Sequence, residues 1–443
     1  MQFCMAERLT AYRDSEDMLP LAPGAPVALR APRALMAALL LACAISAQAQ
    51  AAGPASAAPL LEASASGPAP GASAQPGAAL PRPRVWVSVP RLRSRLQARD
   101  LGLVINTADP YSVAVGQHYV RARGLRPQQV LRVRLPVAPV LSPEEFDTLR
   151  QAIEKHFGPQ TQALALAWAA PYAVACNSIT GALALGFDAG LCSNGCAASR
   201  PSGYFNSATT RPLTAPGWRP SMLLAARNVE QAVALIDRGV ASDGSLFMVD
   251  REPVSALMLV TDDRARAVRM ALYPPTALPP ALGVELRVEP TATLRSARRV
   301  LTVTTGSEKL ELQPPPDWVP GALADHLTSF GGDLQGLHGQ ATALDWISSG
   351  ATASHGAVSE PCNHPQKFPH PQVLLLHYLQ GATAIEAYWK SVAWPQQSLF
   401  IGEPLAAPFS PPLSPSSRPS PPASAARAPA APVSAAPAAE KAP

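Results

Sequence analysis

The chain has 443 residues, 50 of which are Pro, and a formal net charge of +5. Charged residues make up 15% of it, below the roughly 25% of an average soluble domain, and no run of Lys or Arg occurs. This composition argues against a nucleic-acid-binding protein. Only one stretch is apolar enough to approach a membrane span, which excludes a protein with several spans.

The start of the chain has the pattern of a secretory signal peptide. Arg30 and Arg33 precede an apolar run at 34–47, which ends in an Ala-Gln-Ala motif. We therefore expect residues 1–49 to be removed on export. The alternatives are a membrane anchor, for which the run is short, and a lipoprotein modified at Cys43. We expect an exported protein of the periplasm or cell envelope, without a span in the mature chain.

Two segments rich in Ala, Pro, Gly and Ser flank the middle of the chain. They cover residues 50–84 and 411–443. Such segments bury too little apolar surface to offset the entropy of ordering them, so we predict a disordered linker and a disordered tail. The remaining residues, 85–410, are enough for one large domain or for two closely joined subdomains.

Within this domain, strand and helix patterns follow one another along the chain. In chain order we expect a strand at 101–106, a helix at 111–123, a strand at 129–135, a helix at 143–157, a strand at 162–168, a strand at 222–226, a helix at 228–238, a strand at 256–260, a helix at 264–272, strands at 283–288 and 300–305, a helix end and strand at 348–358, helices at 373–379 and 383–389, and a strand at 398–401. This order predicts an α/β fold: a mostly parallel sheet flanked by helices in three layers.

Ligands of such sheets bind at the carboxyl ends of the strands. The loops that follow Trp168, Thr261, Thr305 and Val358 are therefore the first places to look for a site.

Four cysteines remain after the signal segment, and an even number in an exported protein favours disulfides. They are Cys176, Cys192, Cys196 and Cys362. Three pairings are possible, and Cys192 and Cys196 are close enough to pair across their short loop. The loop at 169–206 is too long for a plain connector. It is either a binding loop or a surface excursion pinned by disulfides, and the cysteines favour the second.

A polar cluster lies in the segment 320–332. Asp325 and His326 are adjacent, and Ser329 follows. A His near hydroxyl and carboxylate groups suits general acid–base or nucleophilic catalysis. The alternative is a helix that starts after Pro320 and ends at a pair of glycines.

The segment 355–370 contains a second group of reactive side chains. Cys362 is a candidate nucleophile, with His326, His355 or His364 as its base. The alternative is that Cys362 forms a disulfide. The Cys-x-His spacing is unusual for zinc, so we expect no metal, and nothing in the sequence calls for a cofactor.

Two tryptophans near the end of the domain are candidates for ligand contact. Trp389 and Trp394 have rings able to stack on a sugar or a peptide, although such rings more often pack in a core. Glu386 and Lys390 have the spacing of a helix-stabilising pair. The candidate ligand-binding residues are Glu360, Asn363, His364, Trp389, Lys390 and Trp394.

Five long segments resemble an uncharacterised family of exported bacterial proteins that occurs in genomes with the exosortase protein-sorting system. They are ADPYSVAVGQHYVRARGL, LALAWAAPYAVACNSITGALALGFD, PGALADHLTSFGG, GATASHGAVSEPCNHPQKFPHP and EAYWKSVAWPQQSLFIGEPLA. The resemblance implies a setting in the envelope of exopolysaccharide-producing bacteria, but no activity. The chain lacks the sorting tail that exosortase recognises, so it looks like an associated factor and not a sorted cargo.

The order of elements is also similar, more weakly, to the caspase–gingipain type of cysteine peptidase. In that fold a His-Gly pair follows one strand and the nucleophilic Cys follows a later one. Here the strand at 300–305 ends without a His, and Ser329 stands where a Cys is expected. The usual cysteine-peptidase dyad is therefore missing.

These observations leave three functions open. The first is an exported envelope factor of unknown activity, whose site for envelope proteins or polysaccharide comes from 320–332 and 355–370. The second is a hydrolase or transpeptidase with a divergent caspase-like fold. Its nucleophile would be Cys362 or Ser329, its base His326, and its orienting group Asp325 or Glu360. The third is a carbohydrate-binding module that uses Trp389 and Trp394.

Overall fold

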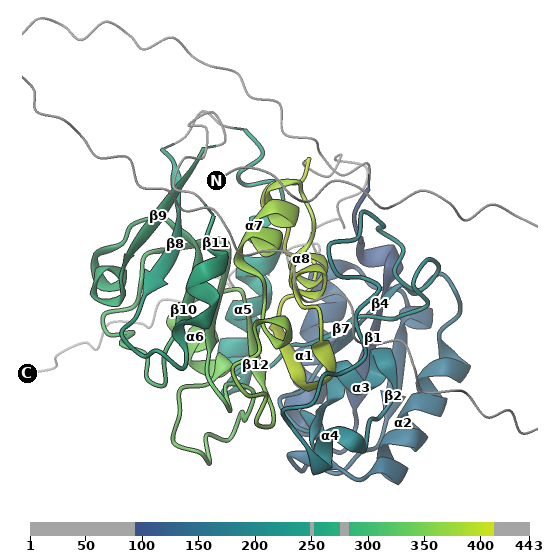
Figure 1. The fold of residues 1–443 in the computed structure, drawn as a ribbon. Helices are drawn as coiled ribbons and strands as arrows, with labels where there is room; N and C mark the ends of the chain where they lie inside the picture. The colour runs from purple at the N-terminus through teal and green to yellow at the C-terminus, as the bar shows by residue number, and fades with distance from the viewer. Residues whose placement is uncertain (1–93, 249–251, 275–282, 412–443) are drawn as a thin grey trace, which may run out of the picture. The chain divides into compact units, whose positions relative to one another are not determined.

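A ten-stranded sheet runs through the described part of the protein (Figure 1). The computed structural model describes residues 94–248, 252–274 and 283–411. The predicted signal segment and linker lie outside these residues, as does the predicted tail beyond residue 411. In sheet order the strands are β2 (Val130–Val133), β1 (Leu101–Asn106), β4 (Ala163–Leu166), β7 (Ser221–Leu223), β13 (Ser398–Gly402), β12 (Ala353–Ala357), β11 (Trp318–Leu327), β10 (Val300–Gly306), β8 (Val254–Val260) and β9 (Val284–Pro290).

The sheet is mostly parallel, as the sequence predicts. The pairings from β2 to β7 and from β12 to β9 are parallel, whereas β12 and β13 pair antiparallel. Parallel strands are covered on both faces, so their sequences are continuously apolar. All six residues of β1 are buried, for example.

Helices cover both faces of the sheet (Figure 1). The first layer contains α1 (Pro110–Arg123), α5 (Val229–Ser242) and α6 (Ala343–Ser349). The second contains α7 (Pro371–Leu379), α8 (Ala384–Ser391) and the 3₁₀ helix η3 (Ala267–Leu272). The remaining α-helices among the described residues are α2 (Pro143–His156), α3 (Ile179–Leu185) and α4 (Gly190–Ser193).

The helices expected at 111–123 and 143–157 form, and a capping residue precedes each of them. The Asp109 carboxylate accepts a hydrogen bond from the Tyr111 N–H, and Pro110 occupies the first turn of α1. At α2, Ser142 and Glu145 form a capping box. Both arrangements satisfy backbone N–H groups that have no partner within the helix. None of the helices in the described ranges is long and apolar enough to cross a membrane.

Two expected helices take other forms. The alternative reading of 320–332 as a helix is wrong, because most of this segment belongs to β11. Its apolar residues pair with β10 on one side and β12 on the other, and this burial in the sheet overrides the helix-like start. In the expected helix 264–272, only η3 forms, as a 3₁₀ helix.

The loops that follow β4, β7, β11 and β12 meet at one edge of the sheet, here called the carboxyl edge. Tyr172, after β4, donates a hydrogen bond to Asp333, after β11. Ser359, after β12, donates to the carbonyl of Cys176. Arg227, after β7, pairs with Asp345 at the start of α6. A small second sheet lies here too, formed by β3 (Val140–Leu141), β5 (Ala173–Val174) and β6 (Asn177–Ser178).

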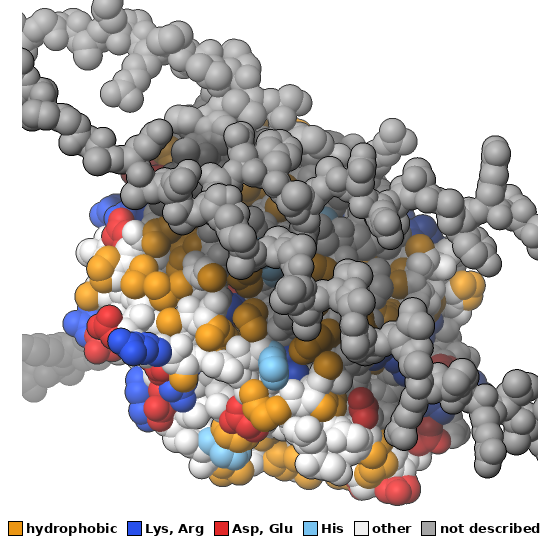
Figure 2. Space-filling model, in the orientation of Figure 1, with side chains coloured by type: hydrophobic (Ala, Val, Ile, Leu, Met, Phe, Trp, Pro, Cys, Tyr) orange, Lys and Arg blue, Asp and Glu red, His pale blue; other side chains and the backbone are white. Residues whose placement is uncertain are grey.

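The surface drawn in Figure 2 carries charged side chains of both signs. Lys and Arg side chains lie interspersed with Asp and Glu along the margin that holds β8 and β9 in Figure 1. Hydrophobic side chains lie scattered between them. Along this margin the charges of the two signs therefore alternate.

Candidate functional site

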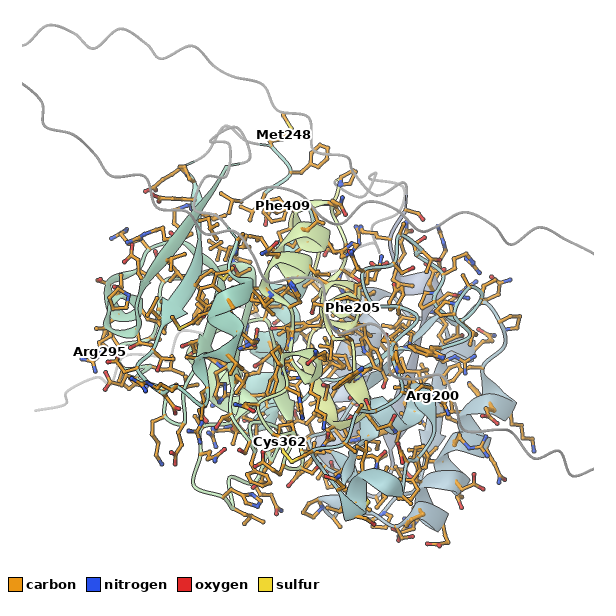
Figure 3. The ribbon with its side chains drawn as sticks, viewed as in Figure 1. Arg200, Phe205, Met248, Arg295, Cys362 and Phe409 are labelled. Carbon is orange, nitrogen blue, oxygen red and sulfur yellow. A yellow bond between two sulfur atoms is a disulfide. The ribbon has the colours of Figure 1, made fainter. Side chains whose placement is uncertain are left out.

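Two disulfides pin the loop at 169–206, one within the loop and one between the loop and the segment that follows β12. They join Cys176 to Cys192 and Cys196 to Cys362. The short Cys192–Cys196 pairing suggested by the sequence is therefore wrong. The prediction of a loop pinned by disulfides is confirmed. Figure 3 labels Cys362, whose disulfide with Cys196 lies near the lower end of the view.

Cys362 is not available as a nucleophile. Its sulfur is bonded to Cys196, and only a free thiolate attacks a substrate. Its backbone has φ 55°, which is unusual for a residue with a side chain. Its N–H donates to the Glu360 carboxylate at 2.8 Å. Cys362 therefore fixes the shape of its loop.

His326, the predicted base, is a buried structural residue. Its Nδ1 accepts a hydrogen bond from the Trp346 indole at 2.9 Å, so its Nε2 carries the proton and donates to the Ala341 carbonyl at 3.0 Å. Burial lowers the pKa of His326 to about 4. Both ring nitrogens are occupied, so His326 has no lone pair to offer a substrate.

Asp325 does not orient His326, because consecutive residues of a strand point to opposite faces. Its carboxylate accepts a hydrogen bond from buried Arg269, which also donates to the carbonyls of Thr305 and Pro369. Burial raises the pKa of Asp325, and Arg269 opposes this effect. Asp325 and Arg269 thus form an ion pair that ties η3 to the sheet.

Two of the six candidate ligand-binding residues lie in the core. Trp389 is fully buried and donates its indole N–H to the Ser221 carbonyl. Lys390 is also fully buried, with its ammonium 5.1 Å from the centre of the Tyr204 ring. Burial lowers the pKa of Lys390. The expected pair of Lys390 with Glu386 is not among the ion pairs of the described residues, because Glu386 caps the start of α8 instead.

The other four candidate ligand-binding residues gather at the carboxyl edge. Glu360 and Asn363 are exposed, and His364 and Trp394 are partly exposed. The His364 and Trp394 rings meet edge to face, with centroids 6.0 Å apart. The sequence therefore located a surface cluster here.

A carboxylate–imidazole pair that the sequence reading missed lies in the loop after β11. Asp333 Oδ2 is 2.8 Å from His338 Nδ1. A carboxylate only accepts hydrogen bonds, so Nδ1 is the donor and Nε2 keeps a free lone pair. The Asp333 side chain is 4% exposed and the His338 side chain 46% exposed. The buried acid thus holds a base that faces solvent.

Further contacts fix both members of this pair. Asp333 also accepts hydrogen bonds from the Tyr172 hydroxyl at 2.8 Å and from the backbone N–H of Leu337 at 2.7 Å. The His338 ring stacks on Phe330, with centroids 3.6 Å apart and planes 5° apart. Burial tends to raise the pKa of Asp333, but the hydrogen bonds from His338, Tyr172 and the backbone outweigh it and lower this pKa. Asp333 is therefore ionised.

A second carboxylate–imidazole pair serves as a comparison. His118 on α1 lies 2.7 Å from Asp237 on α5. Asp237 is 59% exposed, and the pair lies on the helical layer, away from the strand ends. Among the described residues, the His118 ring is held by this bond alone, whereas the His338 ring also stacks on Phe330 and is bound to a buried acid with several hydrogen bonds.

Ser329 lies next to the new pair in the chain. It is partly exposed and directly precedes Phe330, the residue that stacks on His338. Among the described residues, its hydroxyl makes no hydrogen bond to an imidazole. In the same part of the chain, no group of three or more His, Cys, Asp and Glu side chains is placed to hold a metal ion.

The pair Asp333–His338 was missed because its residues are five positions apart in a Gly-rich stretch without a repeating pattern. The available signal was their position, since the stretch follows a strand of a parallel sheet and polar residues there often line sites.

Comparisons of the chain with protein-family models, curated proteins and solved structures found no match.

Proposed function

We propose that the chain is an exported hydrolase of the bacterial cell envelope, in which His338 is the general base and Asp333 orients it. The observation that carries the proposal is the buried Asp333 carboxylate bound to Nδ1 of a half-exposed imidazole at the carboxyl edge. Hydrolysis by general base catalysis needs a base held in one tautomer, with its free nitrogen facing the substrate.

In the proposed reaction, water attacks the carbonyl carbon of an ester. As the new carbon–oxygen bond forms, His338 Nε2 takes a proton from the water and becomes an imidazolium ion, which Asp333 stabilises. The ester carbon–oxygen bond then breaks, and Nε2 returns the proton to the departing alcohol. Ester and water become acid and alcohol, and His338 ends neutral.

Water is the nucleophile that the geometry supports, in preference to Ser329. A nucleophilic serine needs a hydrogen bond to its base, and the Ser329 hydroxyl has none to an imidazole among the described residues. The other proposed nucleophile, Cys362, is in a disulfide.

The setting of the proposed enzyme is the periplasm or the cell surface. Two disulfides are compatible with an exported protein, because they persist in oxidising compartments. The resemblance to the exosortase-associated family supports a role beside that sorting system and its exopolysaccharide. We propose envelope polysaccharide or envelope proteins as the partners.

The orientation of the base is testable without a substrate. In the ¹⁵N-labelled full chain, imidazole ¹⁵N–¹H correlation spectra should show His338 with its proton on Nδ1. Asp333→Ala should shift the proton toward Nε2, the tautomer that His326 already has. A His338 ring with its proton on Nε2 in the unmodified chain would contradict the assignment.

The activity is tested with p-nitrophenyl acetate and with an acetylated polysaccharide. We expect His338→Gln to lower the rate at least about a hundredfold, the usual contribution of a general base. His118→Gln removes the matched imidazole of the surface pair and should leave the rate unchanged. Ser329→Ala should also keep most of it. Equal losses in the His338 and His118 variants, or no hydrolysis by the unmodified chain, would sink the proposal.

A further inference from the structure

A partly exposed aromatic pair stands where the loop that follows β12 meets the segment between α8 and β13. Trp394 and His364 meet edge to face with centroids 6.0 Å apart. The Trp394 backbone N–H donates to the Gln366 carbonyl at 2.8 Å, which ties this residue to the loop. Edge-to-face contact leaves ring surface available, and a Trp face packs well against the C–H groups of a flat ligand.

Polar groups with open hydrogen-bonding capacity stand beside the aromatic pair. Glu360 is exposed, and within the described ranges only its Oε1 carboxylate oxygen accepts a hydrogen bond, from the Cys362 N–H. Asn363 is exposed as well, and its amide has no hydrogen bond to another described residue. A carboxylate and an amide together accept from and donate to hydroxyl groups.

The loop is held in place before any ligand arrives. The Cys196–Cys362 disulfide fastens its tip. Gln397 donates a hydrogen bond to the Glu360 carbonyl at 2.9 Å. Because the loop is already ordered, a ligand would lose little of its binding energy to ordering it.

The charge of the loop disfavours an anionic ligand. Its only lysine, Lys367, is 1% exposed and donates its ammonium protons to the Gly195 carbonyl. Burial lowers the pKa of Lys367 to about 8. Phosphate and sulfate groups are bound by exposed Arg or Lys, and this loop presents neither. Its exposed groups fit a neutral ligand rich in hydroxyls.

We propose that Glu360, Asn363, His364 and Trp394 bind a neutral saccharide unit of a polysaccharide. Resting on the proposed function, this inference makes an acylated polysaccharide the substrate of His338. The two loops are neighbours, because the Gly332 N–H donates to the Ala357 carbonyl at 2.7 Å. The saccharide site would thus hold the polymer while His338 acts on an ester further along it.

The test is affinity gel electrophoresis of the full chain in gels that contain soluble acetylated xylan, deacetylated xylan or anionic polygalacturonate. We expect both neutral polymers to retard the chain more than polygalacturonate does. Trp394→Ala should weaken the binding of xylan about tenfold, the scale of a central aromatic contact. Trp218→Ala, at a partly exposed Trp before β7, is the matched control and should bind as the unmodified chain does.

The outcomes separate this inference from the proposed hydrolase. His338→Gln should bind xylan normally while losing hydrolysis of p-nitrophenyl acetate. Loss of xylan binding in Trp394→Ala supports the saccharide site, whatever the esterase rate of His338→Gln. If His338→Gln keeps its esterase rate, only the assignment of His338 as the base fails. The inference is overturned if neither neutral polymer retards the unmodified chain. It is also overturned if the Trp394 and Trp218 variants are retarded equally.

Discussion

Asp325 and His326 are consecutive in the chain, yet their side chains bind groups on opposite faces of the sheet. Asp325 accepts a hydrogen bond from Arg269 of η3, and His326 accepts one from Trp346 of α6. The alternation of side chains along a strand separates them. Each ties a different helical layer to β11, so we expect changes at either position to affect stability.

The pH dependence of stability follows from the burial of His326. Its pKa is about 4 in the folded protein and about 6.5 in the unfolded chain. Between these values the unfolded state binds more protons, so the free energy of unfolding falls as the pH drops from about 6.5 to about 4. The contribution of His326 is about 3 kcal/mol.

This prediction is checked by urea unfolding between pH 4 and 7. Burial also lowers the pKa of His377 to about 4, and this group adds to the fall in the same window. His326→Asn should therefore have a lower free energy of unfolding at pH 7. Between pH 7 and 4, its free energy of unfolding should fall by about 3 kcal/mol less than that of the unmodified chain. Parallel profiles for the variant and the unmodified chain would contradict a lowered pKa of His326 in the folded protein.

A buried ion pair joins α1 to the end of β13. Arg123 donates two hydrogen bonds to Glu403, at 3.0 Å and 2.5 Å, and a third to Asp243. Glu403→Gln should lower the free energy of unfolding by about 3 to 5 kcal/mol, because it leaves a buried guanidinium poorly compensated. Glu154→Gln removes an exposed partner of Arg150 and should cost less than about 1 kcal/mol. Equal costs in denaturant titrations would refute the distinction.

The two disulfides should contribute unequally to stability. Cys196 and Cys362 are 166 residues apart, whereas Cys176 and Cys192 are 16 apart. In the chain-entropy account, closing the longer loop stabilises the fold by about 5 kcal/mol and the shorter one by about 3 kcal/mol. Double Cys→Ser variants of each pair, unfolded in urea, measure the difference. A larger loss for the shorter loop would run against this account.

His355 should be replaceable by an aromatic residue of similar shape. It is fully buried, and neither ring nitrogen has a hydrogen-bond partner among the described residues. Its ring lies 5.8 Å from Phe368 and 5.5 Å from Phe400, centroid to centroid. His355→Phe should leave the free energy of unfolding unchanged or raise it by about 1 kcal/mol, because an unpaired polar group leaves the core.

The measurement is thermal and urea unfolding of His355→Phe beside His326→Phe. The second variant loses the Trp346 hydrogen bond and should be destabilised by about 1 to 3 kcal/mol. A comparable loss at both positions would mean that a polar interaction of the His355 ring stabilises the fold.

The sequence by itself determined the order of most strands and helices, the mostly parallel sheet and the places where α1 and α2 begin. These follow from local patterns: apolar runs, capping residues and the alternation of element types. It also located Glu360, Asn363 and His364, which lie close together in the chain, and it named Trp394 as a candidate for ligand contact, although only the fold brings this residue to their loop.

Only the tertiary structure decided which reactive groups meet. Cys196 and Cys362 pair across 166 residues, and Tyr172 reaches Asp333 from the loop of another strand. Local sequence carries no signal for such contacts, because they depend on which strand ends lie side by side in the sheet. The same packing buried both nitrogens of His326 and left Nε2 of His338 open to solvent.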